Sequence, residues 1–262
     1  MSVKRIPDLV PVILVMNEEN WLAYVLGAVQ GRFDRYVIYD IGSQDRTWEI
    51  LQSFINSEKK TAEMFYRRLP FVDPLIQGIF RNSMIAEARS EWYFILDGDE
   101  IYSQPGLDAL ADEMVNMKKQ YEEHGKTYGI IRRVEVMTDL KTAYGQNLDL
   151  KHHRVYHRDM IWTGTHPGEI PFVEQKKRNE HWFSKDIICY HFHNCKRSRL
   201  DENVPKRISR RLKATYHRGE ATPIEIFEKL PVLRHRYENF PVAPELQALW
   251  LDASAERGQT PE

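Results

Sequence analysis

The first hundred residues alternate between short apolar runs and amphipathic stretches, and this alternation constrains the fold more than any other feature. Apolar runs predict buried strands at 12–16, which is rich in β-branched residues, and at 92–96, and further strands are predicted at 35–41 and 61–66. Helical spacing of apolar residues predicts helices at 17–30, 47–55 and 77–88, with Asn17 as the cap of the first. Such a series predicts an α/β fold, a doubly wound, Rossmann-like mixed sheet with helices on both faces.

The rest of the chain changes character twice. A helix is predicted at 107–121, and strands separated by irregular loops are predicted at 128–137, 153–157 and 187–191. After residue 200 the chain becomes helical and basic, with proline breaks. We therefore expect a nucleotide-type α/β half at 1–102, a mixed second half of the same domain at 103–200, and a C-terminal helical extension at 201–262.

Composition excludes several classes of protein. The net charge of −1 gives no bias toward nucleic acid. The longest apolar run, 9–16, is too short to cross a bilayer, and Asn17-Glu18-Glu19 follow it instead of a cleavage site. Two cysteines in 262 residues do not form a disulfide framework. These features predict a cytoplasmic protein, and they leave its oligomeric state open.

Three carboxylates follow the apolar run at 92–96. They belong to Asp97, Asp99 and Glu100, and Gly98 lets the backbone turn between the first two. Carboxylates this close repel one another at the end of a buried strand unless something compensates them. A bound Mg²⁺ or Mn²⁺ would do so, because both ions prefer oxygen ligands. An acidic turn that caps a neighbouring element is the simpler alternative, and the residues alone leave both open.

Two further segments lie where ligands bind in such folds, beyond the carboxyl ends of strands or beside them. Gly42 and Asp45 are explained by the turn and by the cap of the next helix. Asp40 is not, and its carboxylate is placed to accept hydrogen bonds from a base or a ribose. Arg81-Asn82 precede the acidic strand, and a surface ion pair explains them as well as a ligand contact does.

These motifs occur in the order found in one enzyme family. Asn17-Glu18, the block from Asp40 to Thr47, Arg81-Asn82 and the segment from Asp97 to Glu100 together resemble family-two glycosyltransferases of GT-A fold over residues 8–102. Each motif is weak alone, and the ordered set is a strong signal. The resemblance implies metal-dependent transfer of a sugar, with inversion, from a nucleotide-diphosphate sugar to a hydroxyl acceptor.

The resemblance also implies that 1–102 is the donor-binding half and 103–200 the acceptor-binding and catalytic half, and it implies roles for single residues. The donor nucleotide is expected at Asn17, Glu18, Asp40, Ser43, Arg81, Asp97 and Gly98. Asp40 would contact the base, and Asp97 would lie near the ribose and the metal. Asp99 would hold the divalent ion, Mn²⁺ or Mg²⁺, that bridges the donor diphosphate. The family often has aspartate where this chain has Ile41, so the base stays open, with UDP-sugars favoured over GDP-sugars.

The second half resembles the acceptor-side blocks of one bacterial branch more loosely. The similar segments are 154–158, 162–169 and 190–193. Inverting transfer needs a base that takes the acceptor's proton, and we expect Glu169 to serve, with Asp99 and Glu100 as rivals and His166 on the acceptor side. An exposed loop acid is the alternative for Glu169.

Two histidines flank Phe192 near the end of a predicted strand. We expect His191 and His193 to face opposite sides, so that only one reaches the site. His191 is the preferred additional metal ligand, because imidazole binds Mn²⁺ acceptably. His193 is then secondary, and a core or surface position remains an alternative for either.

The basic run at 206–213 has apolar residues on one helical stripe, so a solvated basic face over a packed one explains it. A diphosphate-facing helix, or peripheral contact with the inner membrane surface near a lipid-linked acceptor, are the sharper alternatives. The sequence is equally compatible with a glycan or a small-molecule acceptor.

Two other functions compete with sugar transfer. A sugar-nucleotide nucleotidyltransferase usually needs a basic, glycine-rich loop after the first strand, where this chain has Asn17-Glu18-Glu19. A non-catalytic nucleotide-sugar-binding module would not need intact Asp97, Asp99 and Glu169.

Overall fold

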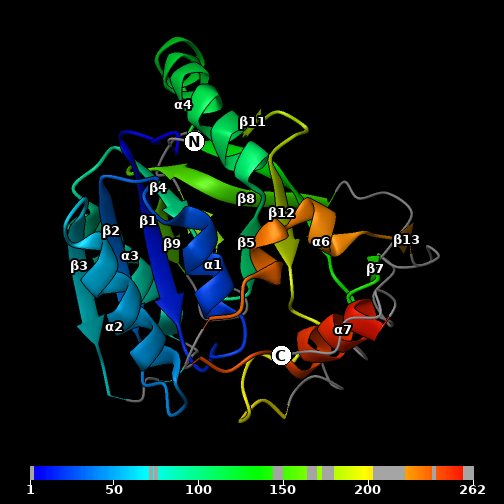
Figure 1. Cartoon of the computed structure of the whole chain (residues 1–262). Coiled ribbons are helices and arrows are strands. Elements are labelled where there is room, and N and C mark those ends of the chain that lie inside the picture. The colour runs from blue at the N-terminus through cyan, green and yellow to red at the C-terminus, as the bar shows by residue number, and fades with distance from the viewer. Residues whose placement is uncertain are drawn as a thin grey trace.

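A computed structural model describes residues 3–70, 73, 76–143, 150–163, 170–172, 180–202, 222–237 and 240–255 (Figure 1). The strands of its main sheet are β1 (Leu9–Val15), β2 (Arg35–Asp40), β3 (Glu63–Arg68), β4 (Trp92–Ile95), β5 (Glu100–Tyr102), β6 (Tyr128–Glu135), β8 (Leu150–His157), β11 (Glu180–Trp182) and β12 (Ile188–His191). Smaller strands are β7 (Thr142–Ala143), β9 (Ile161–Thr163), β10 (Ile170–Phe172) and β13 (Thr222–Pro223). The helices are α1 (Leu22–Val29), α2 (Thr47–Glu58), α3 (Gln77–Ala88), α4 (Gln104–His124), α6 (Ile226–Lys229), η3 (Pro231–Arg234) and α7 (Pro244–Ala255).

The donor half is doubly wound, as expected. β3, β2, β1 and β4 lie side by side in that order, and all three pairings are parallel. Alternate residues of β1 enter two separate cores, because successive side chains of a strand point to opposite faces. Ile13 packs in the core that includes α1 and α2, whereas Val12 packs in the core that includes Met84 of α3. Helices therefore cover both faces of the sheet, and the expected α/β class is confirmed.

The second half of the chain extends the same sheet with antiparallel and parallel pairs. β8 lies antiparallel to β4 and to β6, β12 lies parallel to β6, and β5 lies antiparallel to β12. The nine strands of the main sheet therefore form one mixed sheet in the order β3-β2-β1-β4-β8-β6-β12-β5, with β11 also paired to β6, and β9-β10 and β7-β13 form two separate pairs. No boundary in the sheet separates the two halves.

The link between β4 and β5 shows that this sheet must curl. Three strands separate β4 from β5, so a flat sheet would place them about 19 Å apart. Ile95 and Glu100 are five residues apart, and even a fully extended chain spans only about 18 Å over that number. The link also turns at Gly98 and Asp99. Phe94 and Tyr102 confirm the curl, because their ring centroids lie 5.2 Å apart.

Several local features differ from the sequence predictions, and three of them lie next to the site or in α4. The first helix begins at Leu22, and Asn17, expected as its cap, instead adopts a left-handed conformation with φ of 57°. α4 is longer than expected, because Ser103 caps its start by accepting from Gly106 N–H and Gly125 ends it with φ of 63°. The three-residue strand β5 was not predicted, since it is too short to show periodicity.

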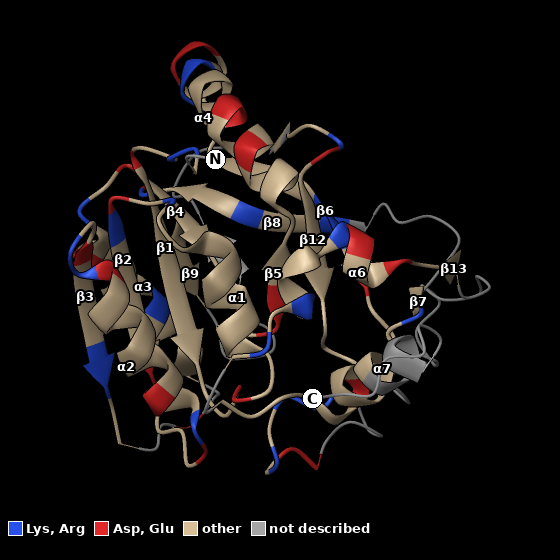
Figure 2. Cartoon of the chain, viewed as in Figure 1, with Lys and Arg blue, Asp and Glu red and all other residues tan. Residues whose placement is uncertain are grey.

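The described part of residues 201–262 contains the helices α6, η3 and α7 together with the short strand β13. The basic run at 206–213 lies outside the described residues. Segments of both charges are interspersed over the visible face (Figure 2), in keeping with the net charge of −1. Among the described helices, none combines the length and the apolar character needed to cross a membrane.

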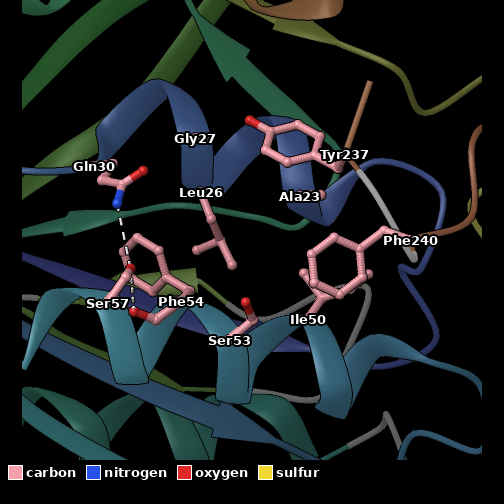
Figure 3. A pocket seen from close by; sticks show the side chains of 10 residues that line it. All are labelled: Ala23, Leu26, Gly27, Gln30, Ile50, Ser53, Phe54, Ser57, Tyr237 and Phe240. Atoms are coloured by element: carbon pink, nitrogen blue, oxygen red, sulfur yellow. Dashed lines mark hydrogen bonds between the residues drawn. The ribbon is translucent and has the colours of Figure 1, made fainter. Parts of the chain in front are cut away.

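A cavity of about 200 Å³ lies in the helical layer between α1 and α2 (Figure 3). Tyr237 and Phe240, from the segment after η3, close it on one side. The Tyr237 ring packs edge-to-face against Tyr24 with centroids 5.3 Å apart. This arrangement depends on Gly27, because a Cβ added there would lie 1.9 Å from Tyr237 Oη.

We expect Gly27→Ala to lower the free energy of unfolding by about 1–3 kcal/mol, the usual cost of overpacking, even though alanine favours helix. Urea unfolding measures the change. Adding Tyr237→Phe should recover part of the loss, because it removes the atom nearest the new methyl group. Wild-type stability in Gly27→Ala would show that Tyr237 does not pack on α1.

Candidate active site

The loops after β1 and β2 are joined by hydrogen bonds around Asp40. This carboxylate is fully buried and accepts a hydrogen bond from Ser43 N–H at 2.9 Å. Asn17 N–H donates to Ser43 Oγ at 3.0 Å, and Asn17 Oδ1 accepts from Gln44 N–H at 2.9 Å. Arg68, at the end of β3, places its Nε 3.5 Å from Asp40 Oδ2. Three of the expected donor-binding residues are therefore brought together.

Glu18 packs against the segment from Asp97 to Glu100. Its N–H donates to Thr47 Oγ1 at 2.8 Å, and its carboxylate pairs with Arg197 at 2.9 Å. Burial raises the pKa of the Glu18 carboxyl, and Arg197 opposes that rise. Gly98 packs directly on the Glu18 side chain, because a Cβ added at Gly98 would lie 2.7 Å from Glu18 Cγ. Glycine is thus required where the two loops touch.

Asp97 lies between two guanidinium groups. Arg81 Nη2 is 3.3 Å from one carboxylate oxygen and Arg154 Nη2 is 2.8 Å from the other. Arg81 is buried and stacks over Trp162, with its guanidinium carbon 5.0 Å from the ring centroid. Asn82 exchanges hydrogen bonds with the Trp162 backbone at 2.7 and 2.8 Å. The alternative of a surface ion pair at Arg81-Asn82 is therefore wrong.

Glu100 is fully buried on β5 and is held by basic groups. Arg154 Nε donates to one of its oxygens at 2.8 Å, and His152 Nε2 lies 2.7 Å from the other. Burial lowers the pKa of Arg154, but Glu100 and Asp97 together raise it well above its ordinary value. Arg154 thus neutralises both acids at once, and this enclosure makes Glu100 a poor rival for the base.

Asp99 meets both histidines. His191 Nε2 lies 3.5 Å from Asp99 Oδ1, and His193 Nδ1 lies 3.8 Å from Asp99 Oδ2. The expectation that the histidines face opposite sides is wrong, because residues two apart on an extended chain point to the same side. Their ring centroids lie 5.1 Å apart.

One carboxylate oxygen and two imidazole nitrogens, all within 4.8 Å of one another, form a ligand set suited to Mn²⁺. Asp97, expected as a further ligand, is not part of this cluster. Glu100, His152 and Cys189 form a second group of this kind, but Arg154 already occupies its carboxylate.

The carboxylates of this cluster favour positive charge on His191. Burial would raise the pKa of Asp99, but His191 holds it well below its ordinary value. Burial would lower the pKa of His191, but Glu135 and Asp99 raise it to about 10. Asp99 and His191 each stabilise the charge of the other, so without an ion the His191 ring carries two protons, and a divalent ion would have to replace the one on Nε2.

The expected base Glu169 and the acceptor-side residue His166 lie outside the described residues. Sequence reasoning also missed four residues of the site. Arg68 and Arg197 gave no signal beyond their charge. Arg154 belonged to a loosely similar block whose role was not assigned. Glu135 was the only acid in the apolar stretch 128–137, a signal for a partnered buried carboxylate.

Comparison with known proteins agrees with this arrangement of motifs. Residues 12–121 match the sequence profile of "Glycosyl transferase family 2". The chain carries a family-two glycosyltransferase segment. This segment contains the donor-side motifs from Asn17 to Asp99, and the expected resemblance is confirmed. A comparison with curated protein sequences gives no match.

Two solved structures are distantly similar to this chain. "S. aureus TarS 1-349" is 14% identical with a TM-score of 0.46, and the match covers 71% of this chain. The chain spans 60% of that TarS chain. "Mannosyltransferase PcManGT from Pyrobaculum calidifontis in complex with GDP-Man and Mn2+" is 13% identical with a TM-score of 0.48, and the match covers 97% of this chain and 76% of that one. Because both likenesses are distant, we assign the GT-A-type architecture from the topology and the family match.

Proposed function

We propose that this chain transfers a sugar from a nucleotide-diphosphate sugar to a hydroxyl acceptor, with inversion, using a divalent ion held by Asp99, His191 and His193. The convergence of these three side chains at the carboxyl end of the sheet is the observation that carries the proposal. When bound, the ion would supply Lewis-acid stabilisation of the leaving diphosphate. The chain's own residues bind and orient the donor around it.

The ribose position is proposed beside Asp97. That side chain is 28% exposed, whereas its two arginine partners are mostly buried. Arg81 and Arg154 fix the carboxylate, so its accessible edge is presented in one orientation. A carboxylate in this place accepts hydrogen bonds from ribose hydroxyls, as acidic residues do in related nucleotide sites.

The base position is proposed beside Asp40, and its geometry favours uracil. Ser43 N–H occupies one carboxylate oxygen, which leaves the oxygen facing Arg68. Uracil presents one N–H between two carbonyl oxygens, so one acceptor beside a guanidinium donor complements it. Guanine presents adjacent N–H donors and would need both oxygens of the carboxylate. We therefore prefer a UDP-sugar over a GDP-sugar.

Thermal shift with nucleoside diphosphates tests the donor proposal. UDP with Mn²⁺ should raise the melting temperature more than GDP with Mn²⁺, and either ligand alone should do less, because the ion and diphosphate bind together. No metal-dependent shift with any nucleotide would contradict the metal site. A larger shift with GDP would contradict only the base assignment.

The acceptor side is proposed at Glu169, with His166 nearby, in a transfer that needs a general base. We expect Glu169→Gln to leave metal-dependent UDP binding unchanged and to lower transfer at least about 10²-fold. Thermal shift and sugar release measure the two effects. Normal transfer by the variant would remove Glu169 as the base.

We also propose a cytoplasmic location, with the basic run at 206–213 contacting either the diphosphate or an anionic membrane surface that carries a lipid-linked acceptor. We further assign donor binding to residues 1–102 and acceptor binding to residues 103–200. Sedimentation with anionic and neutral vesicles tests the membrane contact. Equal sedimentation with both kinds of vesicle would contradict it.

A further inference from the structure

The sheet places three titratable side chains on one rung at the edge of the site. β12 lies between β6 and β5, and His191 is in register with Glu135 on one side and Glu100 on the other. Residues paired across neighbouring strands project to the same face of a sheet. Glu135 and His191 are therefore adjacent by strand register, and this adjacency does not depend on loop conformation.

Glu135 holds the inner nitrogen of the His191 ring. Its Oε1 lies 3.1 Å from His191 Nδ1, and it is fully buried. Arg133, two residues earlier on the same face of β6, places Nε 2.9 Å from that oxygen. Arg133 also contacts His152 Nδ1 at 3.3 Å, so its guanidinium is fixed from two sides. The carboxylate thus has a defined orientation.

The other nitrogen of the same ring faces the proposed ion position. His191 Nε2 points toward Asp99, 3.5 Å from Oδ1. A neutral imidazole carries one N–H and one lone pair, and the hydrogen bond made by one nitrogen decides which the other presents. When Nε2 binds an ion in place of a proton, a carboxylate at Nδ1 holds the remaining hydrogen of the ring on Nδ1.

We propose that Glu135 is a positioning residue that accepts the Nδ1–H of His191 and so directs the Nε2 lone pair to the divalent ion. The inference rests on the proposed function, because it requires the ion to bind at Asp99. Outer partners of this kind orient metal-binding histidines and raise their basicity. Arg133 supports the arrangement by preventing the carboxylate from turning away.

Direct measurement of Mn²⁺ binding tests this role. Electron paramagnetic resonance of free Mn²⁺, with UDP present, gives the affinity without any turnover. Glu135→Leu should weaken Mn²⁺ binding about 10–100-fold, as expected for loss of an outer partner. Glu135→Gln keeps a carbonyl oxygen near Nδ1, so we expect a smaller loss of about 3–10-fold. The glutamine variant carries the test if the leucine variant does not fold.

Two controls separate positioning from general damage. Glu58→Gln neutralises another buried carboxylate, on α2, which accepts a hydrogen bond from Gly31 N–H, and Mn²⁺ affinity should not change. In a His191→Ala background, Glu135→Gln should cause no further loss, because the partner through which it acts is gone.

The outcomes distinguish this inference from the proposed function. Wild-type affinity in both Glu135 variants, with His191→Ala weakened, would overturn the positioning role and leave the metal site standing. An equal loss from Glu135→Gln with and without His191 would overturn it as well. No Mn²⁺ binding by the wild-type protein with any nucleoside diphosphate would overturn the metal site and this inference together.

Discussion

Asp99→Asn should abolish the metal-dependent part of nucleotide binding and lower sugar transfer by about 10²–10³-fold or more. Asp99 supplies the one carboxylate oxygen of the ligand cluster. At ligand concentrations of 100 times the dissociation constant, binding stabilises a protein by about 2.7 kcal/mol. For a chain of this size that corresponds to roughly 5–10 °C in melting temperature. The variant should lose this shift, whereas the melting-temperature shift with UDP in the absence of metal should equal that of the wild type.

Asp186→Asn is the matched control for this experiment. Asp186 is an exposed aspartate in the turn before β12, and Ser184 Oγ donates to it at 3.1 Å. It should retain the full metal-dependent shift and full activity. A normal shift in Asp99→Asn would mean that the ion binds elsewhere, whatever happens to activity.

Arg154→Leu should lower the free energy of unfolding by about 3–5 kcal/mol, the largest effect on stability that we expect from one substitution. Arg154 is the shared partner of fully buried Glu100 and of Asp97, and its removal leaves a carboxylate uncompensated inside the protein. Urea unfolding measures the loss. Adding Glu100→Gln should restore part of it, because the remaining buried group is then neutral.

Arg158→Leu serves as the control for charge and size. Arg158 follows the same strand but is exposed, and its backbone N–H donates to Glu91 O. Stability should change by less than about 0.5 kcal/mol, as for ordinary surface substitutions. A wild-type free energy of unfolding in Arg154→Leu would show that Glu100 is not charged in the folded protein.

The donor half of the site was predictable because its signals are local. Asp40, Asp97 and Asp99 follow apolar strands directly, and parallel strands bring such residues to one edge of the sheet. Strand periodicity therefore placed these carboxylates without knowledge of distant contacts. The helix 77–88 was also predicted with its observed bounds.

The partners of those carboxylates were not predictable in the same way. Arg154 reaches Asp97 only because β8 pairs antiparallel with β4, and Glu135 reaches His191 only because β6 pairs with β12. The local sequence indicates neither of these two strand pairings. The histidine error was different, since the period of an extended chain already places His191 and His193 on the same side.

The curl of the sheet has a consequence for the cost of assembling the site. Residues 96–99 join two strands that are not neighbours, so their length leaves almost no freedom once the sheet has formed. The chain pays the entropy of ordering Asp97 and Asp99 when it folds, before any ligand arrives. An ion and a diphosphate then meet carboxylates already fixed in place, which is the condition under which polar contacts are converted most fully into affinity.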